Sequence, residues 1–66
     1  MQVFELVVRP HFCELHCPKK RKDLGFPTLL GAFAYAQLSM GGEAAEMVVH
    51  FGEGVVEHVP LYRMMA

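Results

Sequence analysis

The segment from Leu29 to Met40 most constrains the fold, because its pattern predicts a helix and it contains no charged residue. Thr28 is a good N-cap residue before it, and Gly41 and Gly42 supply a stop after it. A helix that is apolar on every side is normally buried on every side. A chain of 66 residues buries only about 60% of the surface that its unfolded state exposes. We therefore expect a second copy of the chain to cover part of this helix.

The expected helix has two stripes, one predicted to lie on a sheet and one predicted to face outward. The sheet-facing stripe consists of Leu29, Leu30, Phe33, Ala36 and Met40. The outward stripe consists of Gly31, Ala32, Ala34, Tyr35, Leu38 and Ser39. We expect a symmetric homodimer that forms through part of the outward stripe, where small residues let another backbone approach closely. The expected contact residues are Gly31, Ala34, Tyr35 and Leu38. Strand addition between two copies is the other route to such a dimer.

The apolar content of the chain supports an oligomer. Hydrophobic residues make up 53% of the sequence, which exceeds what one small core can use. We therefore expect a non-enzymatic homo-oligomeric binding or accessory protein with an unidentified partner. A small apolar ligand held between subunits would use the same surface, because ligand pockets are mostly apolar and often lie at interfaces.

Four segments have the alternation or the β-branched composition of strands. They are residues 2–8, 12–17, 47–51 and 55–59. With the helix between the second and the third, they predict a single α+β domain over residues 1–66. We expect a small antiparallel sheet with one helix packed on it, in the order β-β-α-β-β. The charged stretch from Pro18 to Gly25 is expected to be an exposed connection.

The last two strands form a predicted hairpin with Glu53 and Gly54 at the centre of the turn. That register places His50 opposite Glu57. A carboxylate neighbour favours the charged imidazolium, so this cross-strand pair is a candidate proton-transfer pair or pH sensor. The alternative interpretation is that His50 and Glu57 form an ordinary ion pair that only stabilises the sheet.

The second half of the chain also has features of a known family. An alanine-rich helix follows Thr28, and then come Ala45-Glu46-Met47-Val48-Val49-His50, Glu53-Gly54-Val55-Val56 and a closing Tyr62. Together with the opening Val7-Val8-Arg9-Pro10-His11, this arrangement resembles a family of short uncharacterised bacterial domains of unknown function. The resemblance implies a small fold of one helix and a hairpin, and it implies no activity.

The densest group of metal-ligand residue types is His11, Cys13, His16 and Cys17. Zinc prefers four nitrogen or sulfur ligands, which this segment could supply if it curled as a loop. In an extended strand, however, Cys13 and Cys17 lie roughly 13 Å apart, too far to share one ion. Two buried core thiols are therefore the main interpretation, and a zinc protein is the alternative. Without a Cys-x-x-Cys spacing, a Ser-His-Asp set or a Gly-rich phosphate loop, we expect no catalytic residue.

Lys19, Lys20, Arg21 and Lys22 form a run of cations that could grip a nucleic-acid backbone. The net charge is −1, and no aromatic residue is interleaved for base stacking. We expect a solvated connection here, and a nucleic-acid-associated protein is the third hypothesis. The longest apolar stretch, residues 26–40, is shorter than the roughly 20 residues of a bilayer-spanning helix. We therefore expect no membrane partner, and with two cysteines and no signal-peptide pattern we expect a cytoplasmic protein.

Overall fold

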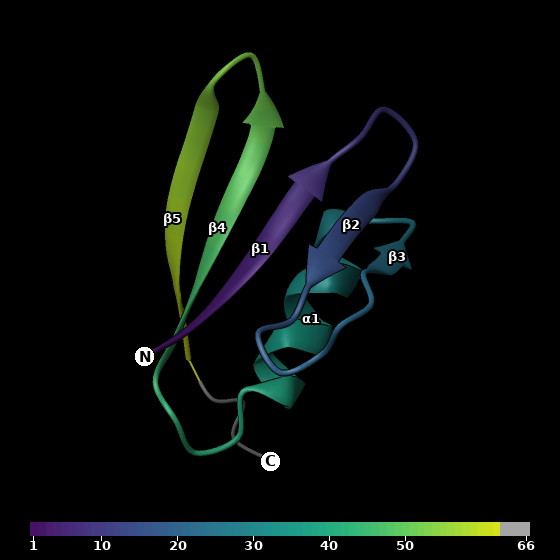
Figure 1. Cartoon of the computed structure of the whole chain (residues 1–66). Helices are drawn as coiled ribbons and strands as arrows, with labels where there is room; N and C mark the ends of the chain where they lie inside the picture. The colour runs from purple at the N-terminus through teal and green to yellow at the C-terminus, as the bar shows by residue number, and fades with distance from the viewer. Residues whose placement is uncertain (63–66) are drawn as a thin grey trace.

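The computed structural model describes residues 1–62, which form an α+β domain with one helix on one side of a five-stranded mixed sheet (Figure 1). The elements are β1 (Gln2–Val8), β2 (Cys13–His16), β3 (Leu24–Phe26), α1 (Leu29–Ser39), β4 (Ala45–Gly52) and β5 (Val55–Leu61). The strands lie side by side in the order β3-β2-β1-β4-β5. This confirms the predicted α+β class.

Two features of the predicted sheet are wrong. The sheet is mixed and not antiparallel, because β1 and β4 pair in parallel while the other neighbours are antiparallel. A parallel pair needs a crossover connection, and α1 lies in the segment that carries the chain back to the start of β1, where Gln2 pairs with Ala45. The predicted order β-β-α-β-β also lacks β3, which occupies the end of the stretch expected to be an exposed connection. β3 has only three residues, which are too few to show the alternation of apolar and polar residues by which a strand is recognised.

α1 packs against β1, β2 and β3 (Figure 1), and the core on this face of the sheet extends to β4. The largest fully buried side chains come from three neighbouring strands: Phe4, Leu6, Leu15 and Met47. The hairpin of β4 and β5 extends past the helix (Figure 1). Most side chains of β5 are therefore exposed, although Leu61 at its end is buried.

The predicted ends of the helix are confirmed. Thr28 is the N-cap, and its hydroxyl accepts a hydrogen bond from the Gly31 N–H at 3.1 Å. At the other end the Met40 N–H donates to the Ala36 carbonyl at 3.1 Å. Gly41 follows with a φ of 65°, the left-handed conformation that ends many helices.

The predicted rotation of the helix is partly wrong. Ala36 and Met40 are buried as expected, but Leu30 is 80% exposed. Ala32, expected to face outward, is fully buried. Because α1 is apolar all round, a helical wheel offers no polar side to orient it. The structure places alanines toward the sheet, where a small side chain lets the helix approach closely.

The predicted pairing of His50 with Glu57 is wrong as well. Glu53 and Gly54 do form the centre of the turn, with φ values of 53° and 78°. The register then shifts between His50 and Gly52, so that His50 pairs with Val56 and Glu57 pairs with Val49. One extra residue on β4 at this bulge moves every later pair by one position.

Candidate functional site

The structure does not bring the four residues of the His/Cys cluster together. Cys13 and Cys17 are buried in the core on either side of Leu15, as free thiols. His16 alternates to the opposite face of the sheet, and His11 is exposed in the turn before β2. Within residues 1–62, no three His, Cys, Asp or Glu side chains are arranged to hold a metal ion.

The environment of Cys17 disfavours its thiolate. Burial raises the pKa of this thiol, and the nearby charge of Lys20 only partly opposes the effect. The thiolate is the nucleophilic form, so a raised pKa means a less reactive sulfur at neutral pH.

Alkylation should therefore distinguish the folded protein from the unfolded one. We expect iodoacetamide to label Cys13 and Cys17 slowly at pH 8 in the native protein and rapidly in urea, because both sulfurs are buried. Mass spectrometry of timed aliquots would follow both sites. Free cysteine added as an internal standard controls for the effect of urea on the reagent. Rapid native labelling of Cys17 would contradict its placement in the core.

Charged pairs occupy the face of the sheet that α1 leaves uncovered. Three imidazoles on this face each contact a carboxylate: His50 with Glu5 at 3.2 Å, His58 with Glu46 at 3.0 Å, and His16 with Asp23 at 2.9 Å. Arg9 donates to Glu14 at 2.7 Å. The pairs join neighbouring strands or a strand to a turn, and all are exposed to solvent. Such exposed pairs contribute at most about 1 kcal/mol each to stability.

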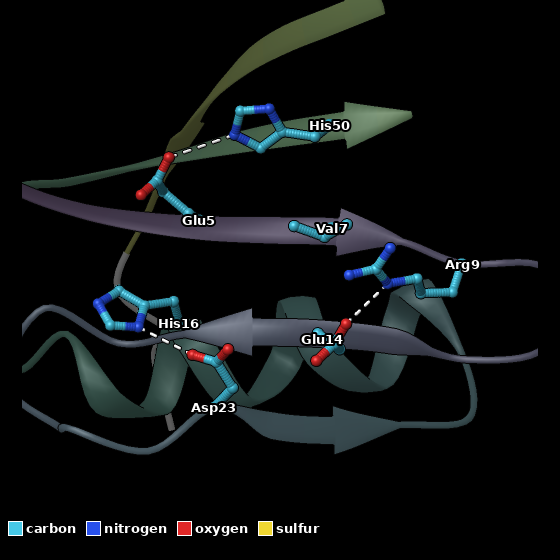
Figure 2. A pocket seen from close by; sticks show the side chains of 7 residues that line it. All are labelled: Glu5, Val7, Arg9, Glu14, His16, Asp23 and His50. Carbon is cyan, nitrogen blue, oxygen red and sulfur yellow. Dashed lines mark hydrogen bonds and ion pairs between the residues drawn. The ribbon is translucent and has the colours of Figure 1, made fainter. Parts of the chain in front are cut away.

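Three of these four pairs border a shallow cavity of about 290 Å³ (Figure 2). Val7 lies between the pairs, and the other lining residues are Glu5, Arg9, Glu14, His16, Asp23 and His50. With both imidazoles neutral, three carboxylates face one guanidinium, so the cavity is acidic. The buried thiols lie on the other side of the sheet, so no cysteine nucleophile faces this cavity.

The basic run of the sequence begins beside α1, where Lys19 and Lys20 lie. We call residues 19–22, between β2 and β3, the basic loop. Lys20 donates a hydrogen bond to the Tyr35 hydroxyl of α1, and its ammonium lies 5.1 Å from the centre of that ring. This hydrogen bond raises the pKa of Lys20, because it stabilises the charged ammonium. Lys19 lies 3.6 Å from Glu43, just after the helix.

The outer side of α1 carries an exposed apolar ridge. We call Leu30, Ala34 and Leu38 the α1 ridge, since positions four apart align on one side of a helix. Leu30 and Leu38 are 80% and 71% exposed, and Ala34 between them is partly buried. Of the other predicted contact residues, Gly31 is partly buried, and Tyr35 packs at 5.4 Å from the Phe26 ring.

Sequence reasoning did not identify the uncovered face as a site. Alternation in residues 2–8 did place Glu5 on the side opposite Phe4 and Leu6. The partner of Glu5, however, is His50, which lies 45 positions along the chain. Only the parallel pairing of β1 with β4 brings them together.

No family model, curated protein or solved structure matches the chain. The resemblance to short uncharacterised bacterial domains therefore stays a prediction. In the described part of the chain, α1 falls short of the length and apolar character needed to cross a bilayer.

Proposed function

We propose that this chain is a non-enzymatic homodimeric binding protein whose two copies join edge to edge at β5. The observation that carries the proposal is the edge of this strand. Within residues 1–62, β5 is the last strand of the sheet order, seven residues long, and it pairs with β4 on one side only. An unpaired strand edge presents a row of N–H and C=O groups to another chain.

The other edge of the sheet is much less suited to pairing. β3 has three residues, and Pro27 follows it directly. Short edge strands and nearby prolines are common ways to block strand addition. β5 has a proline only near its end, at Pro60, which leaves residues 55–59 free of one. The side chains of Phe51, Val55 and Val56 are exposed around this part of the hairpin.

A two-fold axis perpendicular to the sheet suits this contact. Two antiparallel β5 strands are self-complementary, as a symmetric dimer interface requires. The same operation keeps the two α1 helices on one side of a continuous ten-stranded sheet, since each sheet contributes five strands in the described residues. The uncovered faces with their charged pairs then also form one surface.

A lysine on the β5 edge should separate the copies. In Val56→Lys each dimer carries the new charge twice, and lysine on an edge strand opposes pairing. We expect the dissociation constant of the dimer to rise at least about tenfold, which corresponds to about 1.4 kcal/mol. The matched control is Val3→Lys, because Val3 and Val56 are 41% and 43% exposed and Val3 lies on the inner strand β1.

Native mass spectrometry of protein purified without chelator would measure subunit number and bound metal together. A metal-free dimer that Val56→Lys converts to monomer, while Val3→Lys does not, would support the proposal. A monomeric wild-type protein would refute it. A mass excess equal to zinc would instead support the metal-binding alternative, in which His11, Cys13, His16 and Cys17 must rearrange.

A further inference from the structure

The α1 ridge is unusual for a surface helix because nothing charged accompanies it. No acidic residue lies in the first turn of α1 and no basic residue in its last turn, and the segment between them is also uncharged. Leu30 and Leu38 nevertheless project into solvent near the two ends of the helix. Contiguous exposed apolar surface marks contacts with another molecule or with a lipid surface, and Leu30 and Leu38 are the exposed apolar side chains at the two ends of the α1 ridge.

The basic loop lies directly beside this helix. Lys20 contacts Tyr35, and Lys19 and Lys20 line a small cavity of about 50 Å³ together with Ser39 at the end of α1. Figure 1 shows the connection between β2 and β3 passing close to the helix. Arg21 and Lys22 are exposed and, among the described residues, make no ion pair. Their charges are therefore available to a partner.

Three carboxylates of β1, β2 and β4 are on the other side of the molecule, whereas Glu57 of β5 pairs with the buried Val49 and so lies on the helix-side face of the sheet. Glu5, Glu14 and Glu46 lie on the uncovered face, each in contact with a histidine or arginine. Asp23 follows the basic loop, but its side chain pairs with His16 on that same face. The helix side thus combines exposed leucines with cations, of which Lys19 is paired with Glu43, and the uncovered face carries Asp23 and these three glutamates.

We propose that the helix side of this protein docks on an anionic lipid surface, with Leu30 and Leu38 in the interfacial region and the basic loop over the headgroups. Peripheral proteins bind membranes through apolar side chains that lie in the interface and basic residues that attract anionic lipid, and here the two come from α1 and from the loop beside it. Such a contact differs from a bilayer-spanning segment, and it uses a surface separate from the β5 edge.

Two other occupants fit this surface less well. A second copy could cover Leu30 and Leu38, but it would bring a second basic loop to the contact. A nucleic acid would complement the cations of the basic loop, but it offers nothing apolar to cover Leu30 and Leu38. Base stacking would need exposed aromatic rings, whereas Tyr35 is packed against Phe26.

Sedimentation with vesicles would test the proposal on the full chain. The probes are vesicles of phosphatidylserine mixed with phosphatidylcholine, compared with vesicles of phosphatidylcholine alone. We expect binding to the anionic vesicles that weakens about 25-fold when Arg21→Gln and Lys22→Gln are combined, at about fivefold for each cation. Arg9→Gln is the charge control, because Arg9 lies on the uncovered face. It should leave binding unchanged.

The apolar part of the contact has its own pair of variants. Leu38→Gln should weaken vesicle binding several-fold, since it removes an apolar side chain from the interface. Val3→Gln, on the uncovered face, should have no effect.

Equal binding to both kinds of vesicle, or no binding to either, would overturn the proposal. So would tight binding of an oligonucleotide without vesicle binding, or conversion of a dimer to a monomer by Leu38→Gln. Because Val56→Lys leaves the helix side intact, its monomer should still sediment with anionic vesicles.

Discussion

Ala32→Asp should leave the chain unfolded, whereas Leu30→Asp, two positions earlier, should leave it folded. Ala32 is fully buried between α1 and the sheet, so the new carboxylate would have to lose its hydration or be neutralised by a proton. Burial of an unpaired charge is among the few changes that cost more than about 4 kcal/mol. A core of this size rarely supplies more than about 3–5 kcal/mol. The variant therefore has no stability left.

The contrast with Leu30→Asp tests the orientation of the helix directly. Leu30 is exposed in the first turn of α1, where an acidic side chain interacts favourably with the helix dipole. Its free energy of unfolding should stay within about 0.5 kcal/mol of the wild-type value. Circular dichroism during thermal unfolding would measure both variants. A folded Ala32→Asp together with an unfolded Leu30→Asp would mean that α1 is rotated as the helical wheel suggested.

The sequence predicts the limits of α1 well and its rotation poorly, for one physical reason. Helix ends are set by local chemistry, and Thr28 and Gly41 supply that chemistry within the segment itself. Rotation is normally revealed by the contrast between an apolar side and a polar side. α1 lacks this contrast, so only packing against the sheet decides that Ala32 faces inward and Leu30 outward.

The sheet shows a similar division. Alternation predicts β1, and the turn at Glu53 and Gly54 predicts the hairpin. The short strand β3 and the parallel pairing of β1 with β4 depend on contacts between segments far apart in the chain. The extra residue at the bulge before Gly52 is not visible as a pattern either. A single bulge was enough to move His50 away from Glu57.

The candidate surfaces follow the same rule. The basic loop and the leucines of α1 can be recognised in the sequence. Only the fold shows that the loop lies beside the helix, through the contact of Lys20 with Tyr35. The burial of Cys13 and Cys17 was expected from alternation in an extended strand. The pairing of His50 with Glu5 requires the order of the strands.

Leu15→Ala should be the most destabilising large-to-small change in β2, lowering the free energy of unfolding by about 3 kcal/mol. Leu15 is fully buried, pairs with Leu6 on one side and Leu24 on the other, and lies under α1. Removal of its side chain leaves a cavity that two paired strands and a helix are poorly able to close. The loss consists of the transfer free energy of the removed atoms and the cost of that cavity.

Leu38→Ala is the matched control for this prediction, because it removes the same atoms from an exposed position of the α1 ridge. It should change stability by less than about 0.5 kcal/mol, since alanine also favours the helix. Urea unfolding at one fixed protein concentration would compare the two, because dimer stability depends on concentration. The midpoint should fall sharply for Leu15→Ala with an unchanged slope. Equal midpoints for both variants would contradict the burial of Leu15 and the exposure of Leu38.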